Sequence, residues 1–220
     1  MHIMITRRCN MSCAHCCYAC EANGEDMSLR TFKAAVDLAV EMNERVALAG
    51  GEPTVHPLFW DMMEYALSHS DDVFVQTNGK ITNKALALSK MAAVGLITSG
   101  ISQDEWHEPI SPLVIKAFTK RKKSPGDKRF IRDISWDPRR GPQKAGRCDW
   151  GVEKCPMVGS PFVEIGGEIK GCGCEDVPVI GSVFDPEMFV YEYGDHKWKC
   201  WKGLPSPEEE IVVEKEEAAA

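Results

Sequence analysis

The first 135 residues alternate short apolar runs with longer segments of helical periodicity, and this order constrains the fold more than any other feature. Apolar runs of strand length fall at residues 2–6, 45–53, 72–79, 96–102 and 129–135. The segments between them repeat apolar residues every three or four positions, as amphipathic helices do. Strands joined by helices in this order form a parallel sheet with right-handed crossovers. The pattern predicts an α/β fold, an open partial (β/α)6-type parallel barrel whose chemistry lies at the C-terminal strand ends.

The pattern changes after residue 135. Proline, glycine and charged residues dominate as far as Cys155. Residues 161–172 then alternate apolar and polar positions around Gly166 and Gly167, which predicts a β-hairpin. The last residues are acidic and have no apolar face, as is typical of a disordered tail. We expect three parts: a core over 1–147, a small cysteine-rich β-hairpin appendage over 148–203, and an acidic tail over 204–220.

Composition bounds the setting in which this chain works. A chain of 220 residues can bury about 70% of its unfolded surface, so it folds without help from disulfides. The start MHIMITRR lacks the charged beginning and long apolar core of a secretory signal. No run approaches the roughly 20 apolar residues of a membrane span. We expect a cytoplasmic protein with no membrane partner, in which clustered thiols bind metal or perform redox chemistry.

Five of the ten cysteines follow the first predicted strand directly, in the stretch RRCNMSCAHCCYAC. Cys9, Cys13 and Cys16 are spaced C-x3-C-x2-C, and Cys13, Cys17 and Cys20 satisfy the same spacing. Three thiolates on one loop can hold three irons of a [4Fe–4S] cube and leave the fourth iron without a protein ligand. Zinc, which prefers four ligands, is the alternative occupant of such a loop.

The spacing and its position resemble the radical S-adenosylmethionine (SAM) superfamily. In that family the first cysteine closely follows the first strand, and the residue before the third cysteine is usually aromatic. The resemblance implies that Cys9, Cys13 and Cys16 hold the SAM-binding [4Fe–4S] cluster. His15 stands where the family usually has the aromatic residue.

Three strand ends extend the resemblance. The turn in AGGEPTVHP implies that Gly50, Gly51 and Glu52 bind the methionine amino group of SAM. Glycines let backbone carbonyls approach an ammonium closely, and Glu52 can add a charge-assisted contact. The motifs TNG and GISQDEWHE end the next two strands, and by position the resemblance assigns SAM-binding roles to Asn78 and Ser102. A plain turn is the alternative interpretation of the GGEP and TNG motifs.

Other polar residues near these strand ends are less specific. Asp104, His107 and Glu108 resemble an S-x-D-x-x-H pattern that recurs in the family, and a solvated loop is the alternative. His56 is expected to be a structural loop residue rather than a ligand. The fifth predicted strand carries no clear glycine-rich motif for binding adenine.

The C-terminal cysteines resemble a narrower feature. The spacing C-x11-G-x4-C of Cys155, Gly167 and Cys172 is similar to the first half of the SPASM or twitch appendage, whose cysteines flank a β-hairpin and bind an auxiliary iron–sulfur cluster. The dense second run of cysteines in that appendage is absent. The resemblance implies a second iron–sulfur cluster held by Cys155, Cys172, Cys174 and Cys200. Zinc and unligated thiols are the alternatives.

The family resemblance implies a reaction but no catalytic side chain. A reductant such as flavodoxin or ferredoxin supplies one electron, SAM is cleaved reductively to a 5′-deoxyadenosyl radical, and that radical abstracts hydrogen from the substrate. The cofactors carry this chemistry, while the protein supplies position and excludes water. The sequence therefore assigns no acid–base residue to this step.

A basic segment suggests the substrate. Residues 120–147 hold eleven Lys and Arg against three Asp and are interleaved with Phe130 and Trp136. Such a stretch suits the phosphates and bases of DNA or RNA, although an ordinary solvated loop is the alternative. The leading hypothesis is modification or isomerisation of a (hyper)modified nucleobase in DNA or RNA. The alternatives are maturation of a ribosomally made peptide, a small-molecule substrate, and a non-catalytic zinc or iron–sulfur protein.

Overall fold

The computed structural model describes residues 1–119, 126–133, 161–171, 173 and 177–185. The parallel region contains β1 (His2–Thr6), α1 (Leu29–Glu41), β2 (Val46–Gly50), the 3-10 helix η1 (Pro53–Val55), α2 (Phe59–His69), β3 (Val73–Thr77), α3 (Thr82–Ala93), β4 (Thr98–Ser102), α4 (Pro112–Phe118) and β5 (Arg129–Arg132). Three short strands follow: β6 (Phe162–Val163), β7 (Glu168–Lys170) and β8 (Val179–Ser182).

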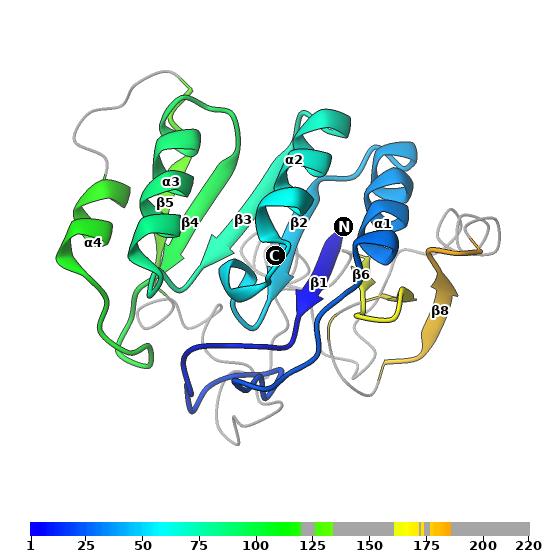
Figure 1. The fold of residues 1–220 in the computed structure, drawn as a ribbon, viewed down its shortest axis with the longest axis horizontal. Helices are drawn as coiled ribbons and strands as arrows, with labels where there is room; N and C mark the ends of the chain where they lie inside the picture. The colour runs from blue at the N-terminus through cyan, green and yellow to red at the C-terminus, as the bar shows by residue number, and fades with distance from the viewer. Residues whose placement is uncertain (120–125, 134–160, 172, 174–176, 186–220) are drawn as a thin grey trace, which may run out of the picture.

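These strands form one sheet in the order β5-β4-β3-β2-β1-β6-β7-β8. The strands β1 to β5 pair in parallel with their neighbours, and the helices between them lie over one face of the sheet, as right-handed crossovers require (Figure 1). The predicted parallel α/β sheet is therefore confirmed. In the described part of the chain, five of the expected strands and the four helices that connect them are present.

The predicted hairpin also forms, and it extends the main sheet. The strand β6 pairs in parallel with β1, so that Ile3 lies opposite Val163. The strands β7 and β8 then continue the sheet as antiparallel neighbours. The hairpin thus lies at the edge of β1 opposite β2 (Figure 1). The cysteine stretch follows β1 directly in the chain.

The core lies between the helices and the sheet. Ile3 and Ile5 of β1 are fully buried, and Phe32 and Val36 of α1 pack in the same cluster. The helix α1 begins where the Ser28 hydroxyl accepts the backbone N–H of Thr31, which satisfies one of its first donors. This buried layer holds the C-terminal strand ends in fixed positions beside one another.

Several predictions concern residues outside the described part of the chain. These are the cysteines Cys155, Cys172, Cys174 and Cys200, most of the basic segment 120–147, and the tail 204–220. Within the described residues, every helix is too short or too polar to cross a bilayer.

Candidate functional site

The cysteine stretch leaves β1 as a loop whose two ends are tied together. The N–H of Cys9 donates to the carbonyl of Glu21 at 2.9 Å, and the N–H of Glu21 donates to the carbonyl of Arg7 at 3.3 Å. The N–H of Arg7 donates to the carbonyl of Glu25 at 2.8 Å. We call these paired segments, 7–9 and 21–25, the neck. The five thiols from Cys9 to Cys20 therefore lie on one closed loop at the C-terminal end of the parallel strands (Figure 1).

The thiols of this loop differ in exposure. Cys9, Cys13, Cys16 and Cys17 are half-buried, whereas Cys20 is 2% exposed. Burial raises the pKa of the Cys9 thiol. A hydrogen bond with Cys16, followed by burial, raises the pKa of Cys20. The free protein thus favours the neutral thiols of Cys9 and Cys20, and a metal that binds Cys9 would displace its proton.

The donor set suits an iron–sulfur cluster in the first of the two registers. The Sγ of Cys9 accepts the N–H of Met11 at 3.4 Å and the Nδ2 of Asn78 at 3.8 Å, and such donors favour a thiolate. Cys20, by contrast, packs beneath the loop, where a Cβ added at Gly51 would lie 2.9 Å from its Cβ. In the first register all three ligands are half-buried thiols, whereas the second register would require the buried thiol of Cys20 to become accessible. This ligand set stays a prediction.

The turn Gly50–Glu52, which we call the glycine turn, packs against the end of β1 and the neck. The N–H of Gly51 donates to the carbonyl of Thr6, and the N–H of Glu52 donates to the carbonyl of Arg8, both at 2.9 Å. A Cβ at Gly51 would lie 2.5 Å from the oxygen of Arg8, and one at Gly50 would lie 2.7 Å from the oxygen of Thr6. Glycine is therefore required by the close approach of two chain segments. The sequence alone suggested only close approach to a ligand.

The buried side chain of Glu52 forms hydrogen bonds that connect neighbouring strand ends. Its Oε1 accepts the N–H of Thr54 at 3.1 Å, the hydroxyl of Thr54 at 2.5 Å and the hydroxyl of Thr77 at 2.7 Å. Its Oε2 accepts the N–H of Asn78 at 2.6 Å. Burial raises the pKa of Glu52, and these donors oppose that rise. The carboxylate thus joins η1 to the end of β3, and its predicted contact with SAM remains a prediction.

Asn78 and Ser102, the other predicted SAM-binding residues, have different neighbours. The Nδ2 of Asn78 donates to the Oδ1 of Asn10 at 2.8 Å as well as to Cys9. The Oγ of Ser102 accepts the Nε2 of Gln76 at 3.1 Å, at the end of β4. Each residue is 7% exposed. Asn78 therefore contacts the cysteine loop, whereas Ser102 is hydrogen-bonded to Gln76 of the neighbouring strand β3.

Two charged residues hold the loop from its other side. The Nζ of Lys80 donates to the carbonyl of Asn10 at 3.0 Å and forms an ion pair with Glu108. The Oε1 of Glu108 accepts the N–H of Ser12 at 3.3 Å. Sequence reasoning missed Lys80 and Asn10. The available signal was their place, since one follows the TNG motif and the other follows the first cysteine.

The hairpin lies beside the cysteine loop. The guanidinium of Arg7 donates to Glu164 at 2.9 Å, and the ring of Tyr18 stacks on that of Phe162 with centroids 5.7 Å apart. A Cβ at Gly173 would lie 2.4 Å from the Tyr18 hydroxyl. This end of the hairpin thus contacts the loop. The auxiliary ligand set predicted around it remains a prediction.

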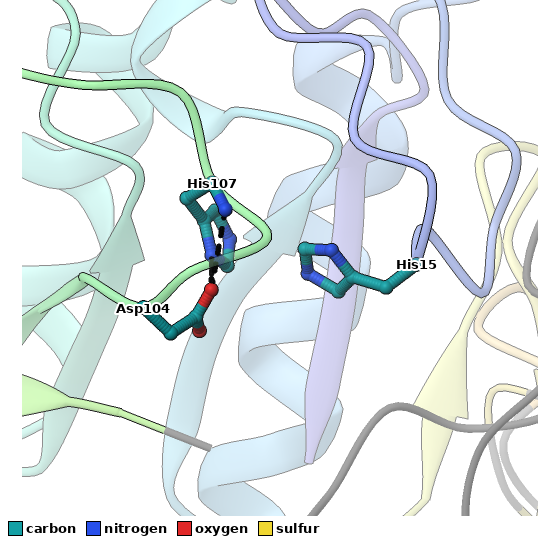
Figure 2. Close-up of side chains that lie close together, drawn as sticks. All are labelled: His15, Asp104 and His107. Carbon is teal, nitrogen blue, oxygen red and sulfur yellow. Dashed lines mark hydrogen bonds and ion pairs between the residues drawn. The ribbon is translucent and has the colours of Figure 1, made fainter. Parts of the chain in front are cut away.

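Asp104 and His107, from the S-x-D-x-x-H pattern, lie close to His15 of the cysteine loop (Figure 2). The Oδ1 of Asp104 is 2.6 Å from the Nδ1 of His107 and also accepts the N–H groups of Trp106 and His107. Burial alone would raise the pKa of Asp104, but the contact with His107, the N–H of Trp106 and the charge of His15 together outweigh it, and the pKa is lowered. The rings of His15 and His107 meet edge to face, with centroids 4.6 Å apart.

His56 has the structural role that the sequence predicted. Its Nδ1 accepts the N–H of Leu58 at 3.0 Å, so that its Nε2 carries the proton in the neutral ring. The Nε2 lies 3.1 Å from the carbonyl of Met27, to which it can donate. Burial lowers the pKa of His56, which keeps the ring neutral.

The chain matches the family model described as "Radical SAM superfamily" over residues 3–130. Mycofactocin maturase MftC of Mycobacterium ulcerans is 33% identical over 102 residues, which make up 46% of this chain and 27% of that protein. The chain therefore matches about a quarter of the length of this relative.

Two solved structures have a similar fold. The complex of BtrN with AdoMet and 2-DOIA superposes with a TM-score of 0.64 at 16% identity, covering 89% of this chain and 81% of that one. The structure of anSMEcpe with bound AdoMet and the Kp18Cys peptide gives a TM-score of 0.56 at 17% identity, covering 89% and 80%. At these identities the likeness establishes the fold alone.

Proposed function

We propose that this chain, which belongs to the radical SAM superfamily, acts on a peptide. Enzymes of that superfamily use SAM and a [4Fe–4S] cluster. When bound, the cluster and SAM supply a carbon-centred radical that removes a hydrogen atom from the substrate. Cys9, Cys13 and Cys16 would hold the cluster, and a reductant such as flavodoxin or ferredoxin would supply the electron. The neck and the glycine turn hold the cysteine loop in place at the strand ends.

The similarity to mycofactocin maturase MftC is the observation that carries the peptide proposal. The bound peptide in the anSMEcpe structure and the half-match of Cys155, Gly167 and Cys172 to the SPASM pattern point the same way. The BtrN structure contains bound 2-DOIA, so a small-molecule substrate is the alternative that the experiments below distinguish.

The nucleobase hypothesis has less support. Of the basic segment 120–147, the structure describes residues 126–133. There the guanidinium of Arg129 is engaged by Asp127 at 2.8 Å and by the carbonyl of Ala117 at 2.6 Å. The ring of Phe130 stacks on Phe74 with centroids 6.0 Å apart. The side chains of Arg129 and Phe130 are therefore engaged within the protein, which does not favour a role for them in binding a nucleic acid.

Single cysteine substitutions test which thiols hold the cluster. After anaerobic reconstitution and reduction, iron content and 5′-deoxyadenosine release are measured for each Cys→Ala variant. We expect Cys9→Ala and Cys16→Ala to lose 5′-deoxyadenosine release and the iron of one cluster, whereas Cys17→Ala and Cys20→Ala retain both. Cys13→Ala serves as the positive control, because both registers require it. The reverse pattern would establish the second register.

The substrate is tested by comparing peptides and nucleosides from source cells by mass spectrometry. The gene is intact, deleted, or replaced by the Cys9→Ala, Cys16→Ala double variant. We expect one peptide to lose its mass change in both the deleted and the double-variant cells. A nucleoside that changes instead would restore the nucleic-acid hypothesis. A change confined to a small metabolite would contradict the peptide proposal in favour of a small molecule.

A further inference from the structure

A second group of side chains that could bind a metal includes a histidine of the cysteine loop and two residues that follow β4. His15 comes from the cysteine loop, and Asp104 and His107 come from the segment that follows β4 (Figure 2). Each residue offers one ligand atom, and these atoms lie within 4.8 Å of one another. We call these three residues the histidine group.

The geometry of the histidine group suits a small divalent cation. Ligands about 2.0–2.1 Å from one ion lie at most about 4.2 Å apart, so a small side-chain rotation brings these atoms into range. Imidazole and carboxylate ligands together suit zinc and neighbouring transition metals. The Oδ1 of Asp104 lies 2.6 Å from the Nδ1 of His107, so an ion bound by both residues would replace this hydrogen bond.

Turn formation accounts for only part of this arrangement. By accepting the N–H groups of Trp106 and His107, Asp104 closes the turn after β4. That role does not require His15, which approaches from a different segment and contacts His107 edge to face. The side chains of Asp104 and His107 are 1% and 12% exposed, so a cation here would be screened little by water.

We propose that His15, Asp104 and His107 bind one divalent transition-metal ion of the zinc class, separate from the iron–sulfur cluster. Three protein ligands leave a fourth position on such an ion for water or for a donor atom of another molecule. The ion would also join the cysteine loop to the end of β4. The proposal does not depend on the identity of the substrate, because metal binding is measured without turnover.

Zinc binding to the cluster-loaded protein tests this site. Loading the cluster first occupies its thiols, after which the protein is dialysed anaerobically against Zn²⁺ and its zinc and iron contents are measured. We expect about one zinc per chain, and at least about tenfold weaker binding in Asp104→Asn and in His107→Gln. Asn can still accept the two backbone N–H groups, so Asp104→Asn removes the charge while keeping the turn. His69→Gln, which alters an exposed histidine at the end of α2, should bind zinc as the original chain does.

Zinc X-ray absorption separates this site from the remaining cysteines. Nitrogen and oxygen ligands lie about 2.0–2.1 Å from zinc, whereas sulfur lies at about 2.3 Å. We expect a nitrogen and oxygen shell whose occupancy falls in Asp104→Asn at the same free zinc concentration, while the iron content stays constant. The proposal is overturned if zinc is absent, if its only shell is sulfur, or if both variants bind it unchanged. None of these results would bear on SAM cleavage.

Discussion

The cysteine loop is held from two sides that are built differently. On the side of β2 and β3, Glu52 is 1% exposed and its carboxylate accepts four hydrogen bonds. On the side of β4, Glu108 is exposed and bridges Lys80 and the N–H of Ser12. One carboxylate is buried among fixed donors, and the other lies in water at the rim of the loop.

The histidines on the two sides differ in the same way. His56 is 1% exposed, with Leu58 and Met27 contacting its two ring nitrogens. His107 is fixed through one nitrogen by Asp104 and turns its ring toward His15. The side at β2 and β3 therefore maintains the shape of the strand ends. The side at β4 places groups that can bind a ligand.

Removing the two carboxylates should give the largest contrast. Glu52→Ala leaves four buried donors without their acceptor and creates a cavity, so we expect it to lower the free energy of unfolding by about 4 kcal/mol. Glu108→Ala should leave the unfolding midpoint nearly unchanged, because an exposed ion pair contributes little. Urea unfolding followed by tryptophan fluorescence measures both. Equal losses of unfolding free energy in the two variants would mean that Glu52 and Glu108 contribute equally to stability, despite their different burial.

The glycine turn provides the next test. A methyl group at Gly51 would meet the Arg8 backbone at 2.5 Å, and backbone atoms cannot rotate away. We expect Gly51→Ala to cost about 3 kcal/mol of unfolding free energy, the upper end for overpacking, and to reduce cluster loading.

Gly126→Ala is the matched control for this substitution. At Gly126 a Cβ meets nothing within 4 Å, and only its φ of +87° opposes a side chain. Its cost should be about 1 kcal/mol, with cluster loading unchanged. If Gly51→Ala behaves like this control, the neck tolerates a methyl group and is not the reason for glycine in this turn.

The pH dependence of stability should reveal the locked histidine. Burial lowers the pKa of His56 in the folded state, so the unfolded chain binds more protons below pH 6.5. The stability that His56 contributes is present above that pH and is lost as the pH falls toward its folded pKa. We expect His56→Gln to flatten the slope of unfolding free energy against pH, by at most about 1.4 kcal/mol per pH unit. An unchanged slope in His56→Gln would mean that His56 is not held as a neutral ring.

The fold could be predicted from the sequence because its signals are local and repeated. The strand β1 spans the run HIMIT, and the other parallel strands lie within the predicted apolar runs. Pairing of β6 with β1 could not be predicted, because nothing in a two-residue strand specifies its partner. The strand β8, VIGS, was missed because it is four residues long and ends in Gly181 and Ser182.

The site was predicted only in part, for a related reason. The spacing C-x3-C-x2-C singled out two overlapping sets of cysteines, because ligands of one cluster can lie close together in the chain, and the family resemblance favoured Cys9, Cys13 and Cys16. Contacts between distant segments leave no such spacing. The four donors to Glu52 and the approach of His15 to His107 depend on how strand ends meet in space. The sequence identified most of these residues but not their neighbours.

The smallest expected effect concerns Asn78, which links the β3 side to the loop. Asn78→Ala removes the bonds to Asn10 and Cys9 and the one accepted from the Lys80 N–H, and we expect a local cost of about 1 kcal/mol, equivalent to about fivefold faster hydrogen exchange in the loop. Exchange within α2 should not change. Gln76→Ala is the control, because Gln76 bonds Ser102 along the sheet. If Asn78→Ala leaves loop exchange unchanged, then the neck and the Lys80–Glu108 pair hold the loop alone, and β3 serves only to position Glu52.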